Sequence, residues 1–187
     1  AKGIRLKYAD VGGGWGVKEG YETPSPAPLA AALGRVFRGS ALKLILEPGR
    51  SIAAPAGVLL TRVLYRKRGG YKNFAVVDAA MNDFIRPALY GAKHPVALLG
   101  PARGPVKKYD IVGPVCESGD FLAHGVNLRE PPVGGLLVIY SAGAYGFSMS
   151  SNYNSRLRAP EALITGRCAW RLIRKREILR DLTAKEV

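Results

Sequence analysis

A thiol and two carboxylates stand together after an apolar segment, in Cys116-Glu117-Ser118-Gly119-Asp120. A cysteine can act as a proton donor or as a nucleophile, and the adjacent Glu117 can accept a hydrogen bond from a ligand amine. The alternative interpretation is a small buried hydrophobic residue, the more usual role of a lone cysteine. Cys116 and Glu117 are therefore candidate site residues, with both interpretations open.

Two glycine-containing loops could hold an anion. Gly12-Gly13-Gly14 follows an expected strand over 4–11, and its backbone N–H groups can approach an anion closely. Glu47-Pro48-Gly49-Arg50 ends the apolar run 42–48 and places a carboxylate, an open backbone and a guanidinium together. Either loop alone could be a tight turn or a surface salt bridge. Because two successive strand ends carry such loops, a ligand site at the carboxyl ends of parallel strands is favoured.

A third group of residues could recognise a carboxylate. Arg86 and Tyr90 lie four residues apart, so a helix over 85–92 would place them on one face. The guanidinium could give two hydrogen bonds to a carboxylate and the phenol a third. Tyr145 stands between glycines in 141–156, a segment too polar for a core and typical of a functional loop. Exposed helical side chains and a plain surface loop are the respective alternatives.

The first part of the chain predicts parallel strands around one helix. The strand over 4–11, a Pro-rich entry at 23–28, a helix over 29–37 and a strand over 42–48 form a βαβ unit. Its connection should be right-handed, and the continuous apolar run of 42–48 indicates a buried strand. We interpret residues 1–57 as the end of a parallel α/β domain.

From residue 58 the sequence predicts a mostly antiparallel β domain, over 58–187. Two apolar runs flank Gly69-Gly70, which is a signal for a two-residue hairpin turn. The last expected strand region contains a turn at Thr165-Gly166. Further strands are expected at 108–116, 134–147 and 161–175, and helices at 85–92 and 176–182.

Composition narrows the classes of partner. The 187 residues include 28 Lys and Arg against 14 Asp and Glu, a net charge of +14 that favours an anionic partner. The basic runs near 66–72 and 167–180 could equally be solvated faces, and no RNA- or DNA-binding motif accompanies them, so nucleic acid is not the expected partner. No apolar run of transmembrane length and no secretory signal are visible, so we expect no membrane partner and a cytoplasmic location. Cys116 and Cys168 give neither a disulfide framework nor a zinc pair, so no metal is expected.

Five motifs, taken in chain order, resemble the carboxy-terminal half of the diaminopimelate decarboxylase family, pyridoxal-phosphate enzymes of the alanine-racemase-like fold type. They are VGGGWG, EPGR, AAMNDFIRPALYGA, VGPVCESGDFLA and SAGAYGFSMSSNYNSR. The resemblance spans the chain and implies the last strands of a (β/α)8 barrel, followed by a mostly antiparallel β-barrel or sandwich domain. The implied activity is decarboxylation of meso-2,6-diaminopimelate to L-lysine. Ornithine and arginine decarboxylases, the nearest rivals in this fold, differ after the cysteine and lack the NDFIRPALY stretch.

The resemblance implies how pyridoxal 5'-phosphate would be held. Gly13 and Gly14 would bind the phosphate through backbone N–H groups, and Gly49 and Arg50 would lie near it. Glu47 would face the pyridine nitrogen and keep it protonated, so that the ring serves as an electron sink.

The resemblance also implies how the amino-acid substrate would be bound. Arg50 would reach one substrate carboxylate, while Arg86 and Tyr90 would bind the distal carboxylate. Glu117 would pair with the distal ammonium. A site built to bond that amine should reject analogues that lack it by roughly 10⁴-fold or more.

In the resembled family, the site forms between two subunits of a homodimer. Cys116 would protonate the carbanion left after carbon dioxide departs, Tyr145 would touch both cofactor and substrate, and Cys116 and Glu117 would be donated to the partner's cofactor. The family's Schiff-base lysine and ring-stacking histidine belong to the first half of its barrel, so we expect this chain to need that half and to be inactive alone. A catalytically incomplete fragment and a basic binding module remain the alternatives.

Overall fold

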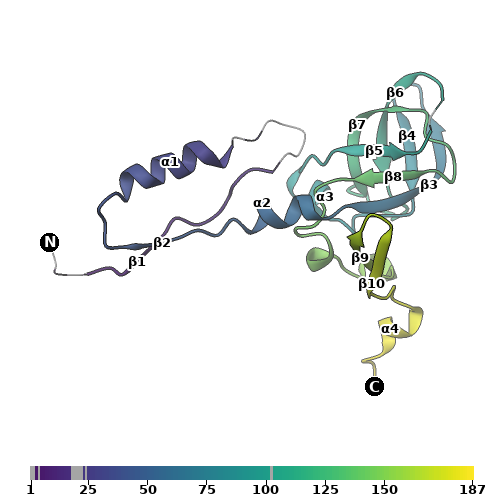
Figure 1. The fold of residues 1–187 in the computed structure, drawn as a ribbon. Helices are drawn as coiled ribbons and strands as arrows, with labels where there is room; N and C mark the ends of the chain where they lie inside the picture. Colours follow the sequence, from purple (N-terminus) through teal and green to yellow (C-terminus); the bar gives the residue numbers. More distant parts are fainter. Residues whose placement is uncertain (1–2, 4, 18–22, 24, 102) are drawn as a thin grey trace.

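The computed structural model describes residues 3, 5–17, 23, 25–101 and 103–187. An N-terminal arm extends away from a curled sheet, and a hairpin and a short helix lead to the C-terminus (Figure 1). The arm contains β1 (Tyr8–Asp10), α1 (Pro26–Val36), β2 (Lys43–Ile45), α2 (Gly49–Ala53) and the 3₁₀ turn η1 (Ala54–Ala56). Residue 4 of the first predicted strand and residue 24 of the predicted Pro-rich entry lie outside the described residues.

The predicted parallel pairing in the arm is confirmed, because Tyr8 lies opposite Lys43 on β2. The helix α1 begins at Pro26, earlier than predicted, since the Ser25 hydroxyl caps it by accepting the Ala27 N–H at 3.3 Å. The prediction of a buried strand over 42–48 is wrong for this chain, because all three residues of β2 are exposed. The short helix α2 was not predicted either, since Pro48-Gly49 reads as a strand end.

The predicted mostly antiparallel sheet is confirmed. It has six strands in the order β5-β8-β3-β4-β6-β7, of which only β4 and β6 pair in parallel. The edge strands β5 and β7 also contact one another, so the sheet curls into a nearly closed barrel (Figure 1). The strands are β3 (Leu59–Arg68), β4 (Asn73–Val77), β5 (Val96–Leu99), β6 (Val106–Val112), β7 (Phe121–Arg129) and β8 (Leu136–Ile139).

The sheet encloses one apolar core. Val63, Val77, Ile111, Leu137 and Ile139 come from four different strands and are at most 1% exposed. Each such side chain contributes about 1.5–3 kcal/mol by leaving water, so this core is what makes the sheet a stable platform for the loops at its edges. The remaining elements are α3 (Arg86–Tyr90), η2 (Phe147–Met149), η3 (Tyr153–Ser155), β9 (Glu161–Gly166), β10 (Ala169–Arg174) and α4 (Leu179–Thr183).

Both predicted hairpins form, but their turns differ from the prediction. Between β3 and β4 the turn has four residues, 69–72, rather than two, because the Gly69 N–H donates to the Lys72 carbonyl at 2.8 Å. Between β9 and β10 the turn lies at 167–168, two residues after the predicted position, because Gly166 still pairs with Ala169.

Two predicted strands are shorter than expected. The strand over 108–116 ends at Val112, since the chain then turns over a buried carboxylate, and the strand over 134–147 is confined to β8 because Ser141 and Tyr145 have positive φ. The strands β5 and β7 were missed: β5 has only four residues, and Gly125 with φ +61 interrupts β7. The helix predicted over 176–182 forms only as the short α4.

Carboxylates neutralise part of the basic runs. Glu130 accepts hydrogen bonds from both Arg66 and Arg68, and Arg174 donates to Glu161 at 2.6 Å. These charge runs are therefore in part the paired faces of strands. No helix in the described part of the chain is both long enough and apolar enough to cross a membrane.

Asp110 on β6 should make stability depend on acid pH. Its carboxylate accepts the Lys72 ammonium at 2.8 Å and the Gly125 N–H at 2.7 Å, and lies 3.1 Å from His124 Nδ1. Burial alone would raise the pKa of Asp110, but these three donors together lower it.

A carboxylate with a lowered folded-state pKa stabilises the protein fully above its unfolded pKa, and this contribution is lost as the pH falls through the folded pKa. We therefore expect Asp110→Asn to reduce the free energy of unfolding at neutral pH, and the deficit to shrink below about pH 4. Urea unfolding at a series of pH values measures this. A deficit that is constant with pH would contradict the assignment.

Candidate functional site

The ends of β1 and β2 carry two loops that lie side by side. The Glu47 N–H donates to the Gly12 carbonyl at 2.9 Å, which continues the pairing of the two strands. A Cβ at Gly13 would lie 2.2 Å from the Glu47 carbonyl oxygen, so only glycine fits there. Gly14 has φ +79 and nothing within 4 Å of its Cβ position, so its backbone faces open space. We call residues 12–16 and 47–50 the strand-end loops.

Arg50 joins the two strand-end loops. Its Nη2 donates to the Trp15 carbonyl at 3.5 Å, and the Gly49 N–H beside it bonds to the Glu47 carbonyl at 2.9 Å. A guanidinium next to open glycine backbone suits a phosphate group, and the exposed Glu47 supplies the carboxylate that a protonated pyridine nitrogen requires. The donor set therefore fits the predicted cofactor.

Arg50 also lines a cleft of about 670 Å³ that contains three further predicted residues. We call this space the cleft. Arg86 and Tyr90 come from α3, and Tyr145 comes from the loop after β8. The lining residues are Arg50, Arg86, Tyr90, Gly91, Ala92, Lys93, Tyr145 and Met149. The structure thus brings together four predicted residues from three separate segments.

Arg86 is the most buried of these charged groups, at 8% exposed, so the alternative of an exposed helical arginine is wrong. Its guanidinium carbon lies 5.8 Å from the Tyr90 ring centre and 5.6 Å from that of Tyr145, within the range of cation–π attraction. Its Nε donates to His94 Nε2 at 3.4 Å, and His94 Nδ1 lies 3.0 Å from the Tyr140 carbonyl. With Nε2 as acceptor, Nδ1 carries the proton that bonds to Tyr140.

His94 was missed by sequence reasoning, although it follows Arg86 by only eight residues. It is 4% exposed, and its ring packs edge-on against Phe84 with the ring centres 4.6 Å apart. His94 therefore orients Arg86 from behind, while the two tyrosines hold it from the side of the cleft.

Tyr145 reaches the cleft from a strained backbone. Its φ is +59, and the same loop contains Ser141 at φ +58. Such conformations cost a non-glycine residue about 1–3 kcal/mol and persist where the surrounding structure enforces them. A Cβ at Gly146 would lie 2.4 Å from the Ala142 carbonyl oxygen, so the tight turn after Tyr145 depends on glycine.

Cys116 and Glu117 do not line the cleft. Both are exposed on the loop 113–120, which we call the pair loop, so the alternative of a buried hydrophobic cysteine is wrong. The Gly119 N–H donates to Glu117 Oε1 at 3.2 Å, and the Tyr153 hydroxyl donates to Oε2 at 3.3 Å. Sequence reasoning missed this role of Tyr153, whose only signal was its place in the polar segment that also contains Tyr145.

The contact with Glu117 predicts a measurable change in Tyr153. The Glu117 charge, followed by the hydrogen bond to it, raises the pKa of Tyr153, because both disfavour the phenolate. We expect Glu117→Gln to lower the pKa of Tyr153, measured by NMR titration with ring-labelled tyrosine. Cys116→Ser is the matched control and should leave most of the shift, since the thiol contributes least. An unchanged titration in Glu117→Gln would show that the contact does not persist in solution.

Comparison with known proteins identifies the family of this chain. Residues 21–143 match the family model described as "Pyridoxal-dependent decarboxylase, C-terminal sheet domain". The chain is 51% identical to the diaminopimelate decarboxylase of Pseudomonas aeruginosa, over 99% of this chain and 44% of that protein. It is 50% identical to that of Vibrio cholerae, over 100% of this chain and 45% of that protein.

A solved structure shares the fold over nearly the whole chain. The diaminopimelate decarboxylase of Helicobacter pylori, solved in complex with L-lysine, superimposes with a TM-score of 0.88 at 44% identity. The match covers 97% of this chain and 45% of that structure. This chain thus spans less than half the length of the relatives it matches.

Proposed function

Because the chain belongs to the pyridoxal-dependent decarboxylases, of which it contains the C-terminal sheet domain, we propose that it is the carboxy-terminal part of a diaminopimelate decarboxylase. The reaction would convert meso-2,6-diaminopimelate to L-lysine and carbon dioxide. The observation that carries the proposal is the cleft in which Arg86, held between Tyr90 and Tyr145, faces the same space as Arg50.

The strand-end loops would hold pyridoxal 5'-phosphate. Gly13 and Gly14 would bind its phosphate through backbone N–H groups, with Gly49 and Arg50 beside them, and Glu47 would face the pyridine nitrogen. When bound, the cofactor supplies an electron sink for the pair released from the breaking C–C bond. The open backbone at Gly14 and the nearby guanidinium of Arg50 support this assignment.

The cleft would bind the two carboxylates of the substrate. Arg86 offers a fixed fork of N–H donors for the distal carboxylate, and the Tyr90 hydroxyl would add a further donor. Arg50 would reach both the cofactor phosphate and the nearer carboxylate, and its contact with the Trp15 carbonyl and its place in the lining of the cleft support this role. Tyr145 would contact both cofactor and substrate, since its ring lines the cleft beside Arg86.

The pair loop would complete the site of a second copy of the chain. Glu117 would accept the distal ammonium, and Cys116 would hold the proton that is delivered to the α-carbon after carbon dioxide leaves. Both side chains are exposed and stand apart from the cleft of their own chain, which supports a homodimer in which each subunit lends them to its partner.

The arm would be covered by the rest of the protein. We propose that residues 1–57 form the last strands of a (β/α)8 barrel and residues 58–187 the β domain. None of the described residues of α1 is buried, and apolar side chains of the arm are exposed. These include Leu6, Tyr8, Val11, Leu44, Ile45 and Leu46. An upstream barrel half, as in the longer relatives, would bury this surface and supply the Schiff-base lysine. We also propose a cytoplasmic location, which the two free cysteines support.

The test is decarboxylase activity of this chain joined to its upstream barrel half. We expect release of L-lysine from meso-2,6-diaminopimelate that requires added pyridoxal 5'-phosphate, and none from the chain alone. L-ornithine and L-arginine should be poorer substrates by roughly 10⁴-fold, because neither has the distal carboxylate and Arg86 and Tyr90 would be left without their partner. If L-ornithine or L-arginine were turned over faster than meso-2,6-diaminopimelate, the protein would instead be the corresponding decarboxylase.

A further inference from the structure

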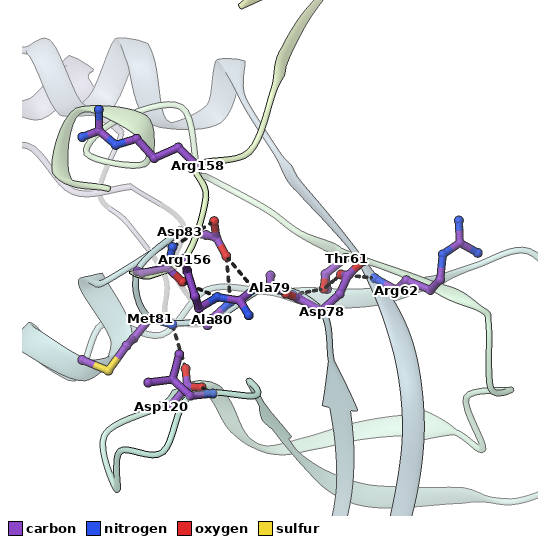
Figure 2. A network of polar contacts seen from close by, with 12 residues as sticks. Thr61, Arg62, Asp78, Ala79, Ala80, Met81, Asp83, Asp120, Arg156 and Arg158 are labelled. Carbon is purple, nitrogen blue, oxygen red and sulfur yellow. Dashed lines mark hydrogen bonds and ion pairs between the residues drawn. The ribbon is translucent and has the colours of Figure 1, made fainter. Parts of the chain in front are cut away.

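A buried carboxylate closes the pair loop. Asp120 is 5% exposed, and its Oδ2 accepts the Val115 N–H at 2.6 Å while its Oδ1 accepts the Met81 N–H at 2.7 Å. Figure 2 shows Asp120 directly below Met81 and Ala80, joined to the Met81 nitrogen. Two main-chain bonds close the same loop, from the Gly113 N–H to the Asp120 carbonyl and from the Asp120 N–H to the Glu117 carbonyl. Cys116 and Glu117 therefore lie between two points that Asp120 fixes.

Gly113 allows the carboxylate to take this position. A Cβ there would lie 2.4 Å from Asp120 Oδ2 and 2.8 Å from the Ala79 carbonyl oxygen. The first residue of the pair loop thus packs directly on the Asp120 carboxylate, so a displacement of Asp120 moves the backbone on both sides of Cys116.

The turn that carries the Met81 N–H is itself held by several hydrogen bonds. The Asp78 carboxylate accepts the Thr61 hydroxyl at 2.7 Å and the Arg62 N–H at 2.8 Å, which ties the turn to β3 (Figure 2). Arg156 donates to the Asp78 carbonyl at 2.6 Å, and the Ala80 N–H donates to Asp83 at 2.9 Å. Asp120 therefore fastens the pair loop to a fixed part of the sheet.

We propose that Asp120 is the positioning residue of Cys116 and Glu117, and that its bonds to Val115 and Met81 set where the two side chains meet the partner's substrate. This inference rests on the proposed function. Asp120→Asn keeps the size of the side chain but replaces one acceptor oxygen by an NH₂ group, which then faces a backbone N–H donor. One of the two buried bonds is lost, and the loop must shift to separate the two donors.

The test compares two substrates in the full-length enzyme: meso-2,6-diaminopimelate, and 2-aminopimelate, which lacks the distal amine. We expect Asp120→Asn to lower kcat/KM for diaminopimelate by roughly 10²-fold, the effect of a displacement of about 1 Å at a reacting group. We define the substrate ratio as kcat/KM for diaminopimelate divided by kcat/KM for 2-aminopimelate. This ratio should fall by about tenfold, since a displaced Glu117 no longer pairs with the distal ammonium.

The matched control is Asp110→Asn. Asp110 is 6% exposed and also accepts a backbone N–H, from Gly125 at 2.7 Å, but it lies on β6 before the pair loop. Asp110→Asn should reduce stability without changing the substrate ratio. If Asp120 had only a structural role, Asp120→Asn would show this same pattern. Asp120→Glu keeps the charge but moves it by one methylene, so it should lower the substrate ratio as well. This variant tests the positioning role if Asp120→Asn does not fold.

Glu117→Gln distinguishes failure of the proposed function from failure of the positioning role of Asp120. If Glu117→Gln leaves the substrate ratio unchanged, the proposed role of Glu117 fails. If Glu117→Gln abolishes the discrimination while the folded Asp120 variants keep the wild-type ratio, the positioning role of Asp120 is overturned and the proposed function stands. Asp120→Asn added to Glu117→Gln should give no further change in the ratio.

Discussion

An enzyme with Cys116→Ala should lose roughly 10²–10⁴-fold in kcat and keep its KM for diaminopimelate nearly unchanged. The thiol would act only after carbon dioxide leaves, when the α-carbon needs a proton, whereas the substrate would be bound by the cleft of the other subunit and by Glu117, which this substitution leaves in place. Loss of the proton donor therefore slows turnover without weakening binding.

Steady-state kinetics of the full-length enzyme with meso-2,6-diaminopimelate check this result. Cys168→Ala is the control, since Cys168 is a free, exposed thiol in the turn between β9 and β10, and both kinetic constants should keep their wild-type values. A Cys116→Ala enzyme that keeps kcat within a factor of a few would remove Cys116 from the reaction.

Arg86→Gln should act on binding instead, lowering kcat/KM by roughly 10²–10³-fold, or about 3–4 kcal/mol. Arg86 is buried and lies within cation–π distance of Tyr90 and Tyr145, so its fork of donors is held in place before the substrate arrives. Without the guanidinium, the distal carboxylate enters the cleft with no cationic partner at that position.

Product inhibition separates this role from a general loss of stability. L-lysine keeps the distal carboxylate, so its inhibition constant should rise together with the KM for the substrate. Arg171→Gln, on exposed β10, is the control and should change neither constant. An Arg86→Gln enzyme that lowers kcat alone, with unchanged inhibition by lysine, would contradict a role in binding the distal carboxylate.

Sequence patterns predicted helices and strands best where neighbouring residues alone determine the structure. The parallel pair β1 and β2 follows from a strand, a helix and a strand, and the glycine of each strand-end loop marks where the backbone turns. The strand β7 was missed because His124, Gly125 and Asn127 interrupt its apolar alternation, and the pairing that makes it a strand comes from β6.

The sequence predicted which residues belong to the candidate site better than it predicted how they are arranged. The spacing of Arg86 and Tyr90 predicted a shared helix face, but the burial of Arg86 depends on His94 and on Tyr145, far along the chain. The position of Tyr145 in turn requires a positive φ that its residue type does not indicate. Asp120 was visible only as a second acid beside the thiol, whereas the structure turns it inward onto backbone N–H groups.

In the proposed homodimer, the cleft of one subunit is completed by Cys116 and Glu117 of the other. Mixing two impaired full-length homodimers, one with Arg86→Gln and one with Cys116→Ala, tests this most directly when activity is measured at a substrate concentration well below the wild-type KM. If subunits exchange at random, about half of the dimers are mixed, and each mixed dimer has one site without a substitution. We therefore expect recovery of about a quarter of wild-type activity. If each site forms within one subunit, every site keeps a substitution, and activity that stays at the mean of the two parent enzymes would contradict a site shared between subunits.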